Sequence, residues 1–231
     1  MVAITQKEFR KLADYIKLNY GINLKEEKKA LVTSRLQNEL SRNNLNNFSE
    51  YYDYILSDKS GKAVAALVEK ITTNHTFFMR EPSHFFYFRD KVLPYLKKTI
   101  TDKDLRVWSA GCSSGEEPYT LAMIIDEFFG KEKVFWDTKV LATDISTKVL
   151  EEAKAGIYSN EDVDMLPSQW KLNYIKRLDS KNSAITDRIK NEVVFRRFNL
   201  MDRVFPFRKK FHVIFCRNVM IYFDAHTKRE L

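Results

Sequence analysis

The chain has 231 residues, of which 44% are hydrophobic and 30% charged, a balance that excludes an intrinsically disordered chain. Its longest apolar runs, such as residues 213–216, are far shorter than the roughly 18 residues that span a bilayer. Two cysteines are too few to staple a chain of this length, so we expect a protein of the reducing cytoplasm without membrane insertion. The net charge of +8 favours an anionic partner.

Helical periodicity dominates the part of the chain before residue 80. The first predicted helix ends at Gly21, and its apolar face consists of Phe9, Leu12, Ala13, Ile16 and Tyr20. A second helix is predicted over residues 25–42 with Leu31, Leu36 and Leu40 turned inward, and shorter helices over 48–56 and 61–71. We therefore predict an all-helical N-terminal domain over residues 1–71. A linker over residues 72–82 follows it, and we expect this linker to line a ligand-binding site.

Strands and helices alternate in the remaining part, residues 83–231. Helices are predicted over 83–99, 116–129 and 146–155, and strands over 105–109, 139–143, 193–198 and 211–216. This alternation predicts right-handed crossovers and an α/β fold with a parallel sheet. Residues 159–192 are too many for a simple connection, so we predict an inserted subdomain there.

A glycine-containing loop follows the first predicted strand and leads into a helix. Gly111 and Gly115 permit a ligand to approach the backbone closely, and the helix opens with Glu116 and Glu117. Two acids at a helix N-terminus would repel a pyrophosphate but would accept a cation such as an ammonium group. A tight turn with a solvated acid pair is the alternative.

Polar side chains end each of the other three strands. Asp144 can accept both hydroxyls of a ribose or cap the following helix. Asn199 and Leu200 can face an adenine, although asparagine often simply ends a strand. Arg217 and Asn218 directly follow the fourth strand. Because ligands of open α/β sheets bind at the carboxyl edge, we expect these groups to line one crevice.

The motifs together resemble a known family, the chemotaxis receptor methyltransferases or CheR family. The resemblance covers nearly the whole chain and rests on the segments TTN (72–74), FFMRE (77–81), VWSAGCSSGEEPY (107–119), ATDI (142–145), GIY (156–158), NL (199–200) and CRNVMIYF (216–223). It implies an enzyme that uses S-adenosylmethionine to methylate glutamate side chains of chemoreceptors, releasing S-adenosylhomocysteine.

The resemblance also implies an architecture and a set of site residues. The fold would be a Rossmann-like domain with an all-helical N-terminal domain and a small inserted antiparallel β subdomain. The cofactor residues would be Asn74, Thr76, Arg80, Glu117, Asp144, Asn199, Leu200, Arg217 and Asn218. Arg80 and Tyr222 match the residues beside the methyl acceptor, and no metal is implied.

Two departures from the family pattern qualify these expectations. The family's sheet continues beyond the fourth strand, so we expect its C-terminal strands to be missing here, leaving apolar surface on that strand. Some members bind a receptor tail through a glycine-containing loop, but residues 178–185 contain no glycine, so we predict no tight binding of that pentapeptide.

A basic stripe supplies a candidate docking surface. Lys28, Arg35 and Arg42 recur every seven residues, nearly in line on the second helix. They could contact the acidic helical bundle of a receptor, or they could form a solvated face.

Two other functions compete with receptor methylation. A nucleic-acid methyltransferase agrees with the net charge, but such enzymes usually carry prolines after the fourth strand, where this chain reads Arg217-Asn218-Val219-Met220. We therefore expect no nucleic-acid partner. A cofactor-binding regulatory scaffold is the non-enzymatic alternative.

Overall fold

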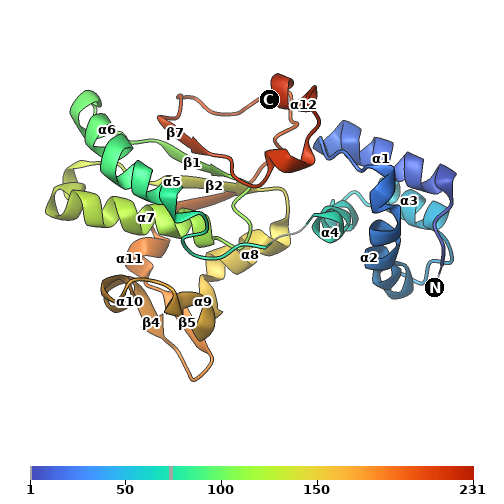
Figure 1. The fold of residues 1–231 in the computed structure, drawn as a ribbon, viewed down its shortest axis with the longest axis horizontal. Helices are drawn as coiled ribbons and strands as arrows, with labels where there is room; N and C mark the ends of the chain where they lie inside the picture. The colour runs from blue at the N-terminus through green and yellow to red at the C-terminus, as the bar shows by residue number, and fades with distance from the viewer. Residues whose placement is uncertain (1, 73–74) are drawn as a thin grey trace. The chain divides into compact units, whose positions relative to one another are not determined.

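Residues 2–72 and 75–231 are described in a computed structural model of the chain (Figure 1). Contacts between residues divide the chain into two compact units. The first comprises Met1–Asn74, Asn199–Arg203 and Asn218–Leu231, and the second comprises His75–Phe198 and Val204–Arg217.

The first unit is built mainly from N-terminal helices, which are α1 (Gln6–Tyr20), the short η1 (Glu26–Lys28), α2 (Lys29–Arg42), α3 (Phe48–Ser57) and α4 (Lys62–Ile71). Thr5 and Glu8 form a capping box that satisfies backbone N–H groups at the start of α1. Gly21 ends α1 in the left-handed conformation with φ 69°, and its N–H donates to the Lys17 carbonyl. The predicted helix and its stop are therefore confirmed.

Helix α2 presents a slightly different face to the core than the sequence predicts. Leu36 and Leu40 are buried as expected, but Leu31 is 44% exposed and its predicted inward position is wrong. Val32 is buried in its place, because Val32 and Leu36 lie one turn apart on the face that packs against α4. Leu31 is rotated away from this row by about 100°.

Two later segments of the chain complete the first unit. Their elements are η4 (Met220–Tyr222) and α12 (Thr227–Glu230). A Cβ atom on Gly21 would lie 2.6 Å from the Met201 sulfur and 3.1 Å from the Phe223 ring, so glycine is required where these segments cross the end of α1. Lys17 pairs with Asp224 at 2.8 Å. The predicted domain ranges 1–71, 72–82 and 83–231 remain a prediction, and they did not anticipate these returning segments.

The second unit contains a four-stranded parallel sheet. Its strands are β1 (Val107–Ala110), β2 (Val140–Asp144), β6 (Val193–Arg197) and β7 (Val213–Phe215), in the order β6-β2-β1-β7. The predicted α/β class with a parallel, Rossmann-like sheet is confirmed. Strand β7 is an edge strand, and its Ile214 is 54% exposed.

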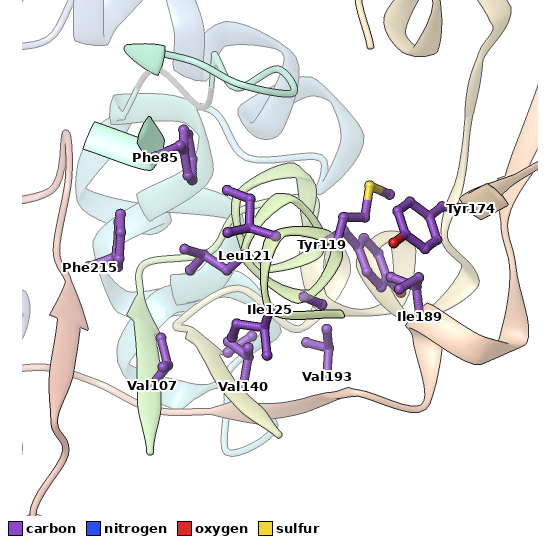
Figure 2. Close-up of a cluster of buried hydrophobic side chains, with 14 of the residues drawn as sticks. Phe85, Val107, Tyr119, Leu121, Ile125, Val140, Tyr174, Ile189, Val193 and Phe215 are labelled. Carbon is purple, nitrogen blue, oxygen red and sulfur yellow. The ribbon is translucent and has the colours of Figure 1, made fainter. Parts of the chain in front are cut away.

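Helix α7 (Glu116–Phe129) forms the centre of the second unit's core. Its Leu121 and Ile125 side chains face Val107 and Val140 of the sheet, as Figure 2 shows. Other elements bury its opposite side, so that nearly the whole helix is buried. The remaining helices are α5 (Pro82–Tyr87), the π-helical η2 (Phe88–Val92), α6 (Leu93–Thr99), η3 (Gly130–Phe135) and α8 (Thr147–Ala155). The π-helical turn and η3 were not predicted.

The inserted segment forms a subdomain of its own, visible beside α7 in Figure 1. It contains β3 (Ile157–Ser159), α9 (Asn160–Asp164), α10 (Ser168–Tyr174), β4 (Ile175–Arg177), β5 (Asn182–Ile185) and α11 (Asp187–Lys190). The three strands pair antiparallel in the order β3-β5-β4, as the family resemblance implies. Across the described residues, no helix is both long and apolar enough to cross a membrane.

Candidate active site

The loop after β1 is tied to the end of the neighbouring strand β2. The N–H groups of Gly111 and Cys112 both donate to the Thr143 carbonyl, at 2.8 and 2.9 Å. Gly111 has φ 82° and Ser113 has φ 48°, so the loop turns sharply through left-handed backbone. This turn keeps the loop at the carboxyl edge of the sheet, where open α/β sheets bind ligands.

Asp144 lies at the end of β2 and holds the same loop through its carboxylate. Its Oδ2 accepts from the Ser113 N–H at 2.9 Å, and its Oδ1 accepts from the Ser146 N–H at 3.0 Å. Burial raises the pKa of Asp144 above its ordinary value, and these backbone donors oppose the rise. Ser146 caps α8 with its own hydroxyl, which leaves Asp144 available for a role other than the helix cap.

Glu117 lies in the first turn of α7 and faces two donors. The Ser109 hydroxyl donates to Oε1 at 2.7 Å, and Arg217 Nη1 donates to Oε2 at 2.8 Å. The Glu117 and Arg217 side chains are only 14% and 11% exposed. Burial raises the pKa of Glu117, while Ser109 and Arg217 both lower it. A carboxylate and a guanidinium therefore stand side by side at the sheet edge.

Glu116, the other acid of the predicted pair, faces the protein instead. Both of its carboxylate oxygens accept from the Ser114 hydroxyl, at 3.0 and 2.9 Å, and burial raises its pKa. The Thr76 hydroxyl opposes this rise by hydrogen bonding. The two acids therefore have different surroundings, and Glu117 is the one that can bind a ligand.

Gly115 also has a packing role that the sequence did not predict. A Cβ atom there would lie 2.9 Å from both the Ala153 Cβ of α8 and the Tyr158 hydroxyl. Its φ of 100° is likewise unfavourable for other residues. Packing of the loop against α8 therefore requires this glycine, and its predicted role in the approach of a ligand stays a prediction.

Arg217 connects several parts of the second unit. Besides Glu117, its guanidinium donates to the Arg80 carbonyl, to Glu81 Oε2 at 3.1 Å and to His84 Nδ1 at 3.0 Å. The Arg80 side chain in turn donates to the His75 carbonyl. Arg80, Glu117 and Arg217, predicted separately, are thus brought together.

Four of the other predicted site residues belong to the other unit of the chain. Asn199, Leu200, Asn218 and Tyr222 belong to the first unit, where Asn199 donates to the Asn19 carbonyl at 2.8 Å. Their membership in the site stays a prediction. Asn74 lies outside the described residues.

The predicted docking stripe on α2 is partly used within the first unit. Arg35 Nη1 donates to the carbonyls of Lys70 and Thr72 at 3.2 and 3.4 Å, where α4 ends. Arg42 is 72% exposed and lies 3.4 Å from Glu39. Arg35 therefore has a structural role that the sevenfold spacing did not reveal.

Neither cysteine is poised as a nucleophile. Burial is the main cause that raises the pKa of Cys112, and the nearby Asp144 and Glu117 add to it. Burial also raises the pKa of Cys216, so both remain thiols at neutral pH. Within residues 2–72 and 75–231, no group of three histidine, cysteine or acidic side chains is placed to hold a metal ion.

Two family models together match almost the entire chain. The model of the CheR methyltransferase SAM binding domain matches residues 74–231, and that of the CheR methyltransferase all-alpha domain matches residues 7–72. The chain belongs to the CheR methyltransferase family. It is accordingly an S-adenosylmethionine-dependent methyltransferase.

Curated relatives of this CheR-family chain agree with the assignment. A chemotaxis protein methyltransferase from Borreliella burgdorferi is 43% identical over 100% of this chain and 82% of its own length. One from Escherichia coli is 34% identical over 100% of this chain and 79% of its own length. A probable chemotaxis protein methyltransferase from Rhizobium etli is 35% identical over 91% and 80%.

The donors and acceptors at the sheet edge of the CheR-family chain fit S-adenosylmethionine. The cofactor's amino-acid end is a zwitterion, which matches the adjacent opposite charges of Glu117 and Arg217. Each carboxylate offers about four acceptor positions, and the donors on Glu117 and Asp144 leave some for an ammonium group and for ribose hydroxyls. S-adenosylmethionine contains no pyrophosphate that these acids would repel.

Sequence reasoning missed three residues of this cluster, namely Ser109, Glu81 and His84. Ser109 is fully buried within an otherwise apolar strand, and a lone hydroxyl in such a run is a usable signal. His84 carries no comparable signal, and Glu81 ends the segment FFMRE (77–81) but was given no role, because only the folded chain brings these two residues to Arg217.

Proposed function

We propose that the chain transfers the methyl group of S-adenosylmethionine to glutamate side chains of chemoreceptors in the cytoplasm. The observation that carries this proposal is the Glu117–Arg217 pair at the carboxyl edge of the parallel sheet, where Asp144 ends the strand β2 that pairs with β1. Opposite charges for an amino-acid end and a carboxylate for a ribose suit this cofactor. The relatives' names supply the chemotaxis context.

The acceptor needs no general base. An ordinary glutamate has a pKa of about 4.3 and is ionised at neutral pH, so its oxygen can attack directly. When bound, S-adenosylmethionine supplies a methyl group activated by its positive sulfur. The enzyme's task is then to align the two reactants and exclude water, which can contribute about 7–11 kcal/mol.

The protein's side chains divide this task. Glu117 and Arg217 would orient the amino-acid end, and Asp144 would bind the ribose. Thr76, Asn199, Leu200, Asn218 and Asn74 are proposed to complete the cofactor site. Arg80 is proposed to steer the acceptor carboxylate, and Tyr222 to hold it by a hydrogen bond.

Receptor docking is proposed to use two basic residues, Lys28 at the end of η1 and Arg42 at the end of α2. Arg42 is well exposed, whereas Arg35 is engaged at the end of α4. We therefore assign the electrostatic contact with an acidic receptor bundle to Arg42 and Lys28. Charge reversal of Arg42 should slow receptor methylation without changing cofactor affinity, and Lys98→Glu on α6 serves as the control.

Tight binding of a receptor tail is not part of this proposal. The turn between β4 and β5 is closed on itself, since the Asp179 carboxylate accepts from the N–H groups of Lys181 and Asn182, both at 2.7 Å. The turn's own residues thus satisfy these donors. A submicromolar dissociation constant for a receptor C-terminal peptide would contradict this expectation.

Transfer of a labelled methyl group tests the function. The chain is incubated with labelled S-adenosylmethionine and either a chemoreceptor cytoplasmic fragment, the same fragment with its acceptor glutamates changed to alanine, or RNA. We expect base-labile label on the first fragment alone. Label on RNA would identify a nucleic-acid methyltransferase, and tight binding of S-adenosylhomocysteine without any transfer would identify a regulatory scaffold.

A further inference from the structure

Two side chains outside the predicted site bind the Arg217 guanidinium. His84 Nδ1 accepts from Nε at 3.0 Å, and Glu81 Oε2 accepts from Nη2 at 3.1 Å. Arg217 itself is 11% exposed, and its guanidinium carbon lies 4.9 Å from the centre of the Phe85 ring. The guanidinium is therefore fixed in its plane by hydrogen bonds and on one face by an aromatic ring.

The bonds formed with described residues use four of the five guanidinium N–H groups. One leaves Nε for His84, one leaves Nη1 for Glu117, and two leave Nη2 for Glu81 and the Arg80 carbonyl. The bond from Nε requires Nδ1 of His84 to be an acceptor, so the proton of the neutral ring lies on Nε2. The remaining N–H on Nη1 is left for the carboxylate of a bound amino acid.

The backbone around Arg80 needs such support. Met79 and Glu81 have φ of 58° and 56°, so left-handed residues flank Arg80 on both sides. This conformation is unfavourable for an L-residue and persists only where the surroundings impose it. The bond from Arg217 to the Arg80 carbonyl is one such constraint.

We propose that His84 and Glu81 are positioning residues for methyl transfer. They orient the Arg217 guanidinium, and through it they place both the Glu117 carboxylate and the main chain of Arg80. Neither is proposed to touch cofactor or acceptor. The inference rests on the proposed function, because it assumes that Glu117 meets the cofactor and Arg80 the acceptor.

Substitutions at His84 separate its acceptor nitrogen from its bulk. His84→Leu removes the acceptor, whereas His84→Asn keeps an oxygen near the place of Nδ1. Tyr87 lies on the same helix and is 65% exposed, so Tyr87→Leu controls for the effect of placing a leucine on this surface. Glu81→Ala and Glu81→Gln form the parallel pair.

The measurements are S-adenosylhomocysteine affinity by calorimetry, kcat for receptor methylation at saturating cofactor, and Tm. His84→Leu should weaken cofactor affinity about tenfold, which corresponds to about 1.4 kcal/mol and to loss of one hydrogen bond to a charged group. Its kcat should also fall while Tm stays near that of the parent. His84→Asn should restore most of both values, and Glu81→Gln should lose less than Glu81→Ala.

A double variant tests whether His84 acts through Arg217. In an Arg217→Ala background, His84→Leu should have no further effect on affinity. Full affinity in His84→Leu, an equal loss in His84→Asn, or an undiminished loss in the Arg217→Ala background would each overturn the inference. If the parent chain does not methylate receptors, the proposed function fails, and the affinity measurements alone still decide the role of His84 and Glu81.

Discussion

The Glu117→Gln variant should show which end of the cofactor Glu117 binds. Glutamine keeps the shape of Glu117: its amide oxygen can accept from Arg217, and its amide nitrogen can donate to the Ser109 hydroxyl. The two hydrogen bonds now measured at 2.8 and 2.7 Å thus keep partners, and only the negative charge is lost. An ammonium group bound there would lose a charge-assisted hydrogen bond.

The size of the effect follows from this single lost bond. A hydrogen bond to a charged group contributes about 1.5–3 kcal/mol, which corresponds to a loss of affinity of about 10- to 150-fold. Burial favours the upper part of this range, since the Glu117 side chain is only 14% exposed. We expect S-adenosylhomocysteine to bind Glu117→Gln with this weakened affinity.

Calorimetry with two ligands shows which end of the cofactor is affected. 5′-Methylthioadenosine has the adenosine and the sulfur but no amino-acid end. Glu117→Gln should weaken S-adenosylhomocysteine and leave methylthioadenosine unchanged, whereas Asp144→Asn should weaken both. Glu116→Gln is the matched control, because Glu116 accepts from Ser114 inside the protein and should leave both affinities unchanged.

Equal weakening of both ligands by Glu117→Gln would refute the reasoning. It would mean that the carboxylate acts on the loop as a whole and does not bind the ammonium group. Unchanged S-adenosylhomocysteine affinity would refute it too, since the acid would then be only a structural partner of Arg217.

Three further predictions concern stability and pH. Gly115→Ala should lower the free energy of unfolding in urea by about 2–4 kcal/mol, because its Cβ would lie 2.9 Å from two other atoms in left-handed backbone. Cofactor affinity measured from pH 8 down to pH 5 should fall, because burial raises the pKa of Glu117 and Asp144 and the protonated acids no longer attract the ligand. In the ligand-free chain, pH has the opposite effect on stability. The raised pKa values of these two acids stabilise the fold at pH values below the ordinary pKa, and this contribution is lost as the pH rises through the raised values. Arg35→Ala should lower the free energy of unfolding by about 1–3 kcal/mol by freeing two carbonyls, whereas Arg42→Ala should change it by less than about 0.5 kcal/mol.

Local pattern predicted much of the fold because the relevant forces act over a few residues. The three- and four-residue spacing from Phe9 to Tyr20 and the stop at Gly21 located α1 within a few residues. The phase of α2 was misjudged at Leu31, because Leu31 and Val32 are both apolar and only the packing partner α4 decides which one is buried.

The candidate site divides in the same way. Glu117, Asp144 and Arg217 could be predicted because the carboxyl ends of parallel strands converge in any fold of this class. The side chains that bind Arg217 could not be predicted, since His84 and Glu81 lie more than 130 positions away in the chain and nothing in their local sequence points to Arg217. Glu116 and Glu117 have different hydrogen-bond partners because their side chains leave the first turn of α7 in different directions.

The pairing of Glu117 with Arg217 also explains how a buried acid can serve a charged ligand. Burial alone raises the pKa of Glu117 and favours the neutral acid, which would not attract an ammonium group. Arg217 and Ser109 oppose this rise and favour the ionised form before any ligand arrives. Because Arg217 is itself bound by His84 and Glu81, it stays in place to do so, and the cost of arranging these charges is met on folding rather than at each binding event.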